Sequence, residues 1–388
     1  MKIGIVLSDV PTYSETFFVT KIRSLKELGH DVILFVSNKT RSFDLCKVIL
    51  SPRIPSSAIR RVFFIGFQVL RLLVSCPTRL FRFVILERKA RRTWAMVARN
   101  LGISAALLPV KLDWLHFGFG TFSLGRENVA QVIGARLAVS FRGFDHYVYP
   151  IKHPGAYSLL LRVADKFHVL SQHMKQDLIR QGVNPTCIEV IPPAIDVSKF
   201  RANEYVETTT LRIITVARLH WIKGLEYTLH ALRALVDRGL SFHYTIVGEG
   251  SEYDRLMFAC HQLGLTEYVT FAGKKSHDET ASLLRNHHLY IQYSIQEGFC
   301  NAVLEAQLAG LLCIVSDADG LTENVVNGET GWIVPRRNPL ALASKILEVV
   351  GLPEEEHALI RSKAIARVCE QFDVSEQRKA FASFYAAV

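Results

Sequence analysis

The chain has 388 residues. This is too long for one ordinary hydrophobic core, and it predicts roughly two to three domains. Its seven cysteines are scattered, with no CxxC pair and no Cys/His cluster, so we expect no disulfide framework, no metal site and reduced thiols in the cytosol. The net charge of +10 is carried by residues 52–99, which hold 11 Lys/Arg and one acid, Glu87; such a local block predicts contact with an anionic surface.

The first predicted elements alternate between strand and helix. Residues 3–10 form an apolar run that indicates a buried strand, because it is too short for the core of a signal peptide. Apolar residues at helical spacing over 15–28 predict a helix that Gly29 ends, and a second strand follows at 31–37. No stretch reaches the roughly 18 apolar residues that a membrane-spanning helix needs. This beginning predicts a cytoplasmic α/β protein.

The loop between the first strand and its helix is PTYSETFF at 11–18, and it contains Ser14, Glu15 and Thr16. These residue types cap a helix N-terminus, and an open N-terminus attracts anions. The loop is therefore a candidate ligand contact, with a plain helix cap as the alternative.

Residues 52–99 predict two helices that Pro77 separates, because a proline ring breaks the helical hydrogen-bond ladder. Polar positions trace one stripe at helical spacing: Arg61, Gln68, Arg71, Ser75, Arg79, Arg82, Lys89, Arg92 and Arg99. Apolar residues surround it: Val62, Phe63, Phe64, Ile65, Phe67, Leu70, Leu72, Leu73, Phe81, Phe83, Val84 and Ile85. A wide apolar face flanked by cations predicts docking on an anionic membrane. The alternative is that the apolar face covers the first sheet and the basic face is solvated.

Two glycine-containing segments follow later strand candidates. HFGFG begins at His116, and SFRGFD at 140–145 contains Arg142 and Asp145. Arginine stays charged at pH 7 and cannot act as a general base, but it can bind a phosphate or an acidic group. We rank Asp145 above His116 as a ligand contact, because a lone histidine is more often structural.

The alternation of strands and helices pauses near residue 200 and then restarts. IPPAIDVSKF at 191–200 carries two prolines and 201–210 is polar, which is typical of a linker. Further strands are predicted at 137–145, 167–171 and 188–196, and after the linker at 211–219, 243–250, 268–274, 289–294 and 312–317. The pattern predicts an α/β protein with two Rossmann-like, doubly wound parallel-sheet domains facing a cleft, where ligands bind outside the carboxyl ends of strands.

In the second domain, Arg218 and Lys223 lie in a loop that follows a strand and ends at Gly224. An arginine fork and a mobile lysine charge can together neutralise a diphosphate leaving group, as a metal ion does elsewhere. Two ordinary surface cations are the alternative. A second glycine-rich strand end, VGEG at 247–250, contains Gly248.

The segment EGFCNAVLE at 297–305 joins a strand to a helix. Gly298 lets the backbone approach a ligand closely. The amides that follow lie at a helix N-terminus, which favours phosphate; they belong to Phe299, Cys300 and Asn301. Glu297 precedes this turn, and Glu305 shares a helix face with Asn301. Two carboxylates around a phosphate cradle fit a sugar nucleotide, with two solvated glutamates as the alternative.

Together these motifs resemble glycosyltransferase family 4, whose members are retaining enzymes of the GT-B fold. The resemblance covers nearly the whole chain and includes the E-x7-E pattern at 297–305, the RLxxxKG pattern at 218–224, and runs at 171–182, 195–200 and 323–335. It implies that Arg218 and Lys223 hold the diphosphate, while Glu297 binds the donor sugar and Glu305 the ribose. It also places the Gly273–Lys274 loop at the nucleobase. The acceptor side would include Ser14, Glu15, Thr16, His116 and Asp145.

The chain departs from the family where HGxD is usual, because Arg142, Gly143 and Asp145 stand there. This departure argues against a mechanism centred on histidine and makes Arg142 and Asp145 candidates for stabilising the leaving phosphate or binding the acceptor. The family also often has proline at the position of Leu312, which concerns a turn rather than the chemistry.

The sequence thus predicts a retaining, metal-independent transfer of a hexose from a UDP- or GDP-linked sugar, without a cofactor. The acceptor would be a glycan or lipid-linked saccharide in bacterial surface-polysaccharide synthesis. The expected location is the inner face of the cytoplasmic membrane, as a cytoplasmic, peripheral protein docked through residues 52–99. Nucleic acid is not an expected partner, since the basic block is rich in aliphatic residues.

The predicted domains are 1–197 on the acceptor side, 198–371 for the sugar nucleotide, and a helix at 372–388 that returns to the first domain. Two alternatives remain open. One is a catalytically silent subunit that only binds sugar nucleotide. This alternative rests on Arg142, which stands where the family usually has a histidine. The other is a sugar-nucleotide epimerase or hydrolase of the same fold.

Overall fold

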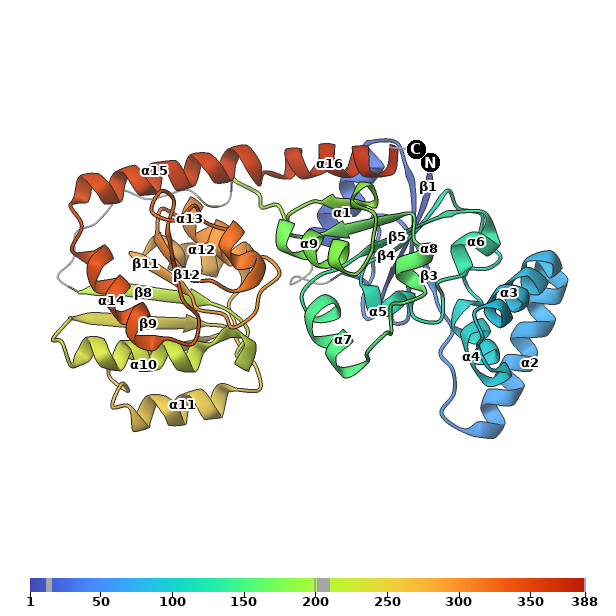
Figure 1. The fold of residues 1–388 in the computed structure, drawn as a ribbon, viewed down its shortest axis with the longest axis horizontal. Helices are drawn as coiled ribbons and strands as arrows, with labels where there is room; N and C mark the ends of the chain where they lie inside the picture. The colour runs from blue at the N-terminus through green and yellow to red at the C-terminus, as the bar shows by residue number, and fades with distance from the viewer. Residues whose placement is uncertain (12–15, 199, 201–209, 387–388) are drawn as a thin grey trace. The chain divides into compact units, whose positions relative to one another are not determined.

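The computed structural model describes residues 1–11, 16–198, 200 and 210–386. Ser14, Glu15 and nearly all of the predicted linker at 201–210 lie outside the described residues. The chain forms two compact units. Met1–Leu170, Met174–Ile191 and Arg378–Val388 make the first unit, and Ser171–His173 and Pro192–Gln377 make the second. Figure 1 shows the elements of each unit.

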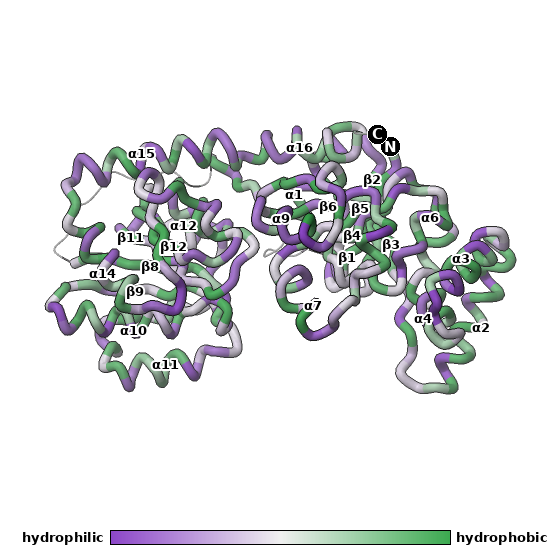
Figure 2. Tube along the Cα trace, viewed as in Figure 1, coloured by the Kyte–Doolittle hydropathy of each residue, from purple (hydrophilic) through white to green (hydrophobic). Residues whose placement is uncertain are grey.

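The first unit is built on a seven-stranded parallel sheet in the order β3-β2-β1-β4-β5-β6-β7. Its strands are β1 Lys2–Leu7, β2 Asp31–Val36, β3 Lys47–Leu50, β4 Trp114–Phe117, β5 Arg136–Ser140, β6 Lys166–Val169 and β7 Ile188–Val190. The strands β1, β2 and β4 are apolar and largely buried (Figure 2), as parallel strands covered on both faces must be.

Helices connect the strands of the first unit. They are α1 Thr16–Glu27, α2 Ala58–Ser75, α3 Pro77–Lys89, α4 Trp94–Ser104, α5 Gly120–Ser123, α6 Val129–Ile133, α7 Tyr149–Lys152, α8 Leu160–Val163 and α9 Gln172–Arg180, with the π-helix η2 Phe144–Val148 and the short 3-10 helix η3 Pro185–Cys187. The prediction that Pro77 separates two helices is confirmed, and Pro77 is the first residue of α3.

The last helix, α16 Val374–Ala386, begins in the second unit, but its residues from Arg378 onward belong to the first. There Phe381, Phe384 and Tyr385 join the core of β1, β2 and α1. Trp114 of β4 donates a hydrogen bond from its indole nitrogen to the carbonyl oxygen of Tyr385, at 3.2 Å.

The second unit has a six-stranded parallel sheet in the order β10-β9-β8-β11-β12-β13. Its strands are β8 Leu211–Val216, β9 Phe242–Val247, β10 Val269–Gly273, β11 Leu289–Gln292, β12 Leu312–Ser316 and β13 Trp332–Val334. Its helices are η4 Trp221–Lys223, α10 Leu225–Val236, α11 Tyr253–Gln262, α12 His277–Arg285, α13 Asn301–Leu308, η5 Asp319–Glu323, α14 Pro339–Val350 and α15 Glu354–Gln371. Side chains of α10, α11 and α14 form one core with the strands.

Both units are therefore doubly wound parallel sheets with helices on their faces, as the alternating pattern predicts. Within the described residues, no helix combines the length and the apolar character needed to cross a bilayer.

Candidate functional site

In the second unit, the loops after β8 and β11 meet, because these strands are parallel neighbours in the sheet. The first loop carries Arg218 and Lys223, and the second carries Glu297. Gly224 adopts φ 63°, and a Cβ at this position would lie 2.1 Å from the carbonyl oxygen of Tyr293. Only glycine lets the two loops pack this closely.

Lys223 and Glu297 form an ion pair between these two loops. Each side chain is only 14% exposed. Burial acts to lower the pKa of Lys223, but the neighbouring charge of Glu297 outweighs it and leaves the pKa above its ordinary value. Lys223 therefore stays protonated at physiological pH, and the pair places two opposite charges at adjoining strand ends.

A buried hydrogen-bonded chain holds Glu297 from the other side. The hydroxyl of Ser294 donates to Oε2 of Glu297 at 3.3 Å, and the side-chain amide of Gln292 donates to Ser294 at 2.9 Å. The hydroxyl of Tyr290 in turn donates to Gln292 at 2.8 Å. None of these three residues was a sequence candidate. The sequence pattern that could have revealed them is a polar side chain at every second position of an otherwise apolar strand, which places all three on one face.

Glu305 lies on α13, behind the loop that carries Glu297. Among the described residues, its carboxylate has no hydrogen-bond or ion-pair partner. Burial raises the pKa of Glu305 to about 7, although an edge of the residue remains accessible. A half-buried acceptor without a donor is suited to hydroxyl groups that a ligand would bring.

Asn324 fastens the loop 298–300 in front of α13. Its side-chain oxygen accepts from the amide of Cys300 at 3.1 Å, and its side-chain nitrogen donates to the carbonyl of Cys300 at 2.8 Å. The prediction that the Cys300 amide contributes to a phosphate cradle is therefore corrected, because that N–H is used inside the protein. Gly320 packs on the same loop, and a Cβ there would lie 1.9 Å from the carbonyl oxygen of Gly298. Phe299 is buried, and Asn301 begins α13.

Arg218 is exposed at the end of β8, and within the described part of the chain no hydrogen bond or ion pair engages its guanidinium. Its neighbours fix the backbone: Leu219 donates to the carbonyl of Glu249 at 3.0 Å. Gly248 has φ 142°, and a Cβ there would lie 1.9 Å from the carbonyl oxygen of Ala217. The structure thus gives Gly248 a role in supporting the Arg218 loop, and its contact with a donor stays a prediction.

Lys274 follows β10 at the same end of the sheet. Its ammonium lies 3.1 Å from a carboxylate oxygen of Glu249, and both side chains are exposed. The carbonyl of Gly273 accepts from the amide of Gly248 at 2.9 Å. This loop therefore adjoins the loop that supports Arg218.

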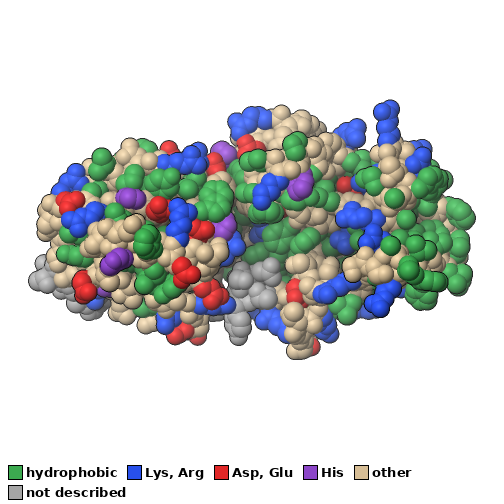
Figure 3. Space-filling view, turned by 90° about the horizontal axis from the view of Figure 1, so that it is seen from below, with side chains coloured by type: hydrophobic (Ala, Val, Ile, Leu, Met, Phe, Trp, Pro, Cys, Tyr) green, Lys and Arg blue, Asp and Glu red, His purple; other side chains and the backbone are tan. Residues whose placement is uncertain are grey.

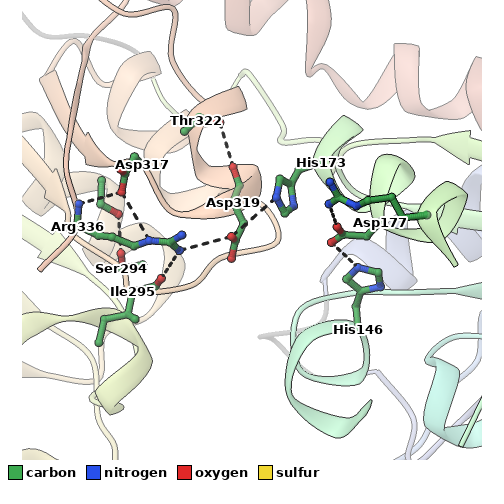
Figure 4. Close-up of polar contacts among 11 residues, drawn as sticks. His146, His173, Asp177, Ser294, Ile295, Asp317, Asp319, Thr322 and Arg336 are labelled. Atoms are coloured by element: carbon green, nitrogen blue, oxygen red, sulfur yellow. Dashed lines mark hydrogen bonds and ion pairs between the residues drawn. The ribbon is translucent and has the colours of Figure 1, made fainter. Parts of the chain in front are cut away.

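Arg336 adds a second clamp on the Glu297 loop, as Figure 4 shows. Its guanidinium donates to the carbonyl of Ile295 at 2.8 Å and lies 3.4 Å from Asp319. Its amide donates to Asp317 at 2.8 Å. Sequence reasoning missed this residue, because a surface arginine two residues after a strand carries no distinctive signal.

In the first unit, Asp145 is buried and joins two strand-end loops. One carboxylate oxygen accepts from the amide of Gly120 at 2.7 Å and the other from the amide of Arg142 at 2.8 Å. Burial raises the pKa of Asp145 despite these hydrogen bonds. The residue is the second residue of the π-helix η2, a rare type of element that is frequent at functional sites. The adjoining His146 lies 3.0 Å from Asp177 (Figure 4). As placed here, Asp145 shapes the loops rather than facing solvent.

Arg142 rests against aromatic rings at the start of α1. Its guanidinium carbon lies 3.6 Å from the ring centroid of Phe17 and 4.8 Å from that of Phe18. Cation–π contacts of this kind orient an arginine. A cation beside a helix N-terminus makes a region that favours anions. Thr16 begins this helix.

His116 is fully buried. Its ring lies 2.6 Å from the hydroxyl of Tyr385, 2.8 Å from that of Ser140 and 3.3 Å from the ammonium of Lys21. Burial, with Lys21 next in effect, holds the pKa of His116 well below its usual value. The ring is enclosed by protein, so in this structure it offers no surface to an acceptor.

Two family models match successive parts of the chain. A family model described as Glycosyltransferase Family 4 matches residues 14–199, and one described as Glycosyl transferases group 1 matches residues 196–365. A protein of Escherichia coli (strain K12) named as a colanic acid biosynthesis glycosyltransferase, WcaL, is 25% identical over 413 residues, with 100% of both chains covered. The amylovoran biosynthesis glycosyltransferase AmsK of Erwinia amylovora is 23% identical, with 90% of both chains covered.

The fold is shared with solved structures. The crystal structure of Anabaena Alr3699/HepE in complex with UDP and glucose superposes with a TM-score of 0.72 at 16% sequence identity, and 100% of both chains is covered. The two family models together reach from residue 14 to residue 365. The chain is therefore a glycosyltransferase of the GT-B fold, with a Glycosyltransferase Family 4 domain in its first half and a Glycosyl transferases group 1 domain in its second half.

Proposed function

We propose that this glycosyltransferase is retaining and metal-independent, and that it transfers a hexose from a UDP- or GDP-linked sugar. The observation that carries the donor part is the arrangement at the strand ends of the second unit. Arg218 is exposed there, Lys223 is held charged beside Glu297, and Glu305 presents a carboxylate without a donor. Two cations match a diphosphate, and two carboxylates match the hydroxyl groups of a sugar and a ribose.

In this proposal Lys223 changes partner during binding. The incoming diphosphate attracts its ammonium, and the carboxylate of Glu297 then accepts hydrogen bonds from the donor sugar. As the bond between the anomeric carbon and the phosphate oxygen breaks, negative charge grows on the leaving diphosphate. Arg218 and Lys223 stabilise that charge, so no metal ion is required for it. Retention follows when the acceptor hydroxyl attacks from the side that the phosphate leaves and gives its proton to that phosphate.

We further propose that the acceptor is a glycan or a lipid-linked saccharide of bacterial surface-polysaccharide synthesis. The names of WcaL and AmsK, which refer to colanic acid and amylovoran, support this pathway. The complex of HepE with UDP and glucose supports a nucleotide-linked hexose as donor. In the first unit, the Arg142 guanidinium beside the N-terminus of α1 suits an anionic group of either substrate.

A panel of sugar nucleotides tests the proposal. One UDP- or GDP-hexose should raise the melting temperature, and with a lipid-linked acceptor pool it should give a product heavier by one hexose, with the anomeric configuration of the donor kept. Product should form equally in EDTA. The Arg218→Ala, Lys223→Ala variant should lose activity by roughly 10³-fold or more. A strict need for Mg²⁺ or Mn²⁺, or inversion of configuration, would refute the mechanism.

A further inference from the structure

Part of the polar stripe on α2 and α3 contacts the rest of the first unit. Arg71 donates to the carbonyl of Ala105 at 2.7 Å, and Arg79 donates to the carbonyl of Leu108 at 2.7 Å. Gln68 is buried, and α2 packs against α4. Gln68, Arg71 and Arg79 therefore help to attach these helices to the first unit, whereas Arg61, Arg82, Lys89 and Arg99 of the same stripe are exposed. Docking of residues 52–99 on an anionic membrane stays a prediction.

The opposite side of these helices is apolar and exposed. We call it the outer face, and we include in it two exposed residues of α4, Trp94 and Met96. On α2 and α3 it consists of Ile59, Val62, Phe63, Phe67, Leu70, Leu73, Val74, Phe81 and Ile85. Phe63 is 74% exposed, Val74 81% and Trp94 65%. Figure 3 shows hydrophobic side chains gathered over this part of the chain, with Lys and Arg beside them. An apolar patch of this extent is unusual for a surface that meets only water.

The exposed charges of residues 52–99 are all positive. The single acid of residues 52–99, Glu87, is fully buried and bonded to Arg92, Asn100 and Asn128. The exposed charged side chains of this segment are Arg53, Arg60, Arg61, Arg71, Arg82, Arg88, Lys89, Arg91 and Arg99. A second copy of the same surface would be repelled, whereas anionic headgroups complement both the apolar centre and the basic surroundings.

The outer face is held rigidly. Arg92 bonds Glu87 at 2.7 Å and Glu127 at 2.6 Å, which joins the end of α3 to the helix α6 region. Leu72, Leu80 and Phe83 pack beneath the exposed residues. Docking would therefore need no ordering of the helices, and so would avoid the entropy that a disordered segment loses when it binds.

We propose that the outer face docks on a bilayer that contains anionic phospholipids. Phe63, Phe67 and Trp94 enter the boundary between headgroups and acyl chains, and the surrounding cations contact phosphate groups. The inference goes beyond glycosyl transfer and does not depend on the donor or acceptor.

Flotation with vesicles tests the docking. Wild-type protein should float with phosphatidylcholine vesicles that contain phosphatidylglycerol, and far less with phosphatidylcholine alone. Replacing Arg60, Arg82 and Lys89 by Gln should weaken binding on the order of a hundredfold, because each cation near an anionic leaflet contributes about fivefold. The Phe63→Ser, Phe67→Ser variant should weaken binding by roughly tenfold or more. Brominated lipid should quench Trp94 fluorescence, which a Trp94→Phe variant identifies.

The matched control removes three exposed lysines elsewhere, Lys26, Lys111 and Lys363, and should bind vesicles nearly as the wild type does. All variants change exposed positions, so their melting temperatures should stay close to the wild-type value. Wild type that stays unbound with anionic vesicles at low salt overturns the proposal. A dimer in solution that the Phe63→Ser, Phe67→Ser variant makes monomeric also overturns it, because the outer face would then join two copies of the chain.

Discussion

At the scale of single residues, Glu297 has two different kinds of support. Lys223 forms an ion pair with its carboxylate, and Ser294 donates a hydrogen bond that orients it. In Glu297→Gln the amide keeps the shape but cannot neutralise Lys223 or accept as strongly from sugar hydroxyls. Transfer should fall by roughly 10²–10³-fold while affinity for the nucleoside diphosphate changes little. Steady-state kinetics and calorimetry with the diphosphate measure the two effects. Glu249→Gln, in an exposed ion pair, is the control, and wild-type turnover in Glu297→Gln would remove Glu297 from the mechanism.

Glu305 gives a pH-dependent prediction. Its pKa of about 7 in the folded protein lies above the usual carboxyl value, so its contribution favours folding at low pH and is lost as pH rises toward 7. Ribose hydroxyls would donate to the ionised form. Nucleotide affinity should therefore fall below about pH 7, with a proton released on binding at pH 6. Glu305→Gln should flatten this pH dependence, weaken binding, and raise the melting temperature more at pH 8 than at pH 5. An unchanged affinity profile in the variant would separate Glu305 from the ribose.

At the scale of elements, the junction between β8 and β11 depends on Gly224. Gly224→Ala combines a left-handed backbone with a Cβ 2.1 Å from a carbonyl oxygen, and it should destabilise the protein by about 2–4 kcal/mol and displace Lys223 from Glu297. Gly239→Ala is matched, because φ is 76° there and nothing lies within 4 Å of the added Cβ. It should cost only about 1 kcal/mol and leave nucleotide binding intact. Equal losses in the two variants, measured by urea unfolding and nucleotide titration, would contradict the role of close packing.

The elements also show where sequence reasoning stops. Runs of Val, Ile and Leu predict the central strands, but β3 and β13 escape notice because they are short strands at the sheet edges. Periodicity predicts which residues of α2 and α3 share a side, yet it cannot say which side packs on the protein. Charged residues in the loops that follow strands predict a donor site. The Tyr290 to Ser294 chain and the Arg336 clamp could not be predicted, because they depend on contacts between distant segments.

At the scale of the whole molecule, the end of the chain is tied to its beginning through a buried polar cluster. Tyr385 of α16 reaches His116 of β4, and Ser140 lies 2.7 Å from His168 of β6. Lys21 of α1 lies against the same ring of His116 and over Phe381. Burial lowers the pKa of Lys21, His116 and His168 well below their ordinary values, and the charge of Arg142 adds to this.

This cluster makes the first unit sensitive to acid. Below about pH 6.5, each of the two histidines binds a proton in the unfolded chain but not in the folded chain. The free energy of unfolding should therefore decrease as the pH decreases, by up to about 1.4 kcal/mol per pH unit for each histidine. The lowered pKa of Lys21 acts in the same direction, and its effect extends above pH 7. In urea unfolding between pH 5 and 8, His168→Gln should reduce the slope of the unfolding free energy against pH by the amount that corresponds to one proton. His153→Gln, at an exposed position, should leave it unchanged. A slope in His168→Gln equal to that of the wild type would show that His168 is not held uncharged, and the acid sensitivity would then have to arise elsewhere in the chain.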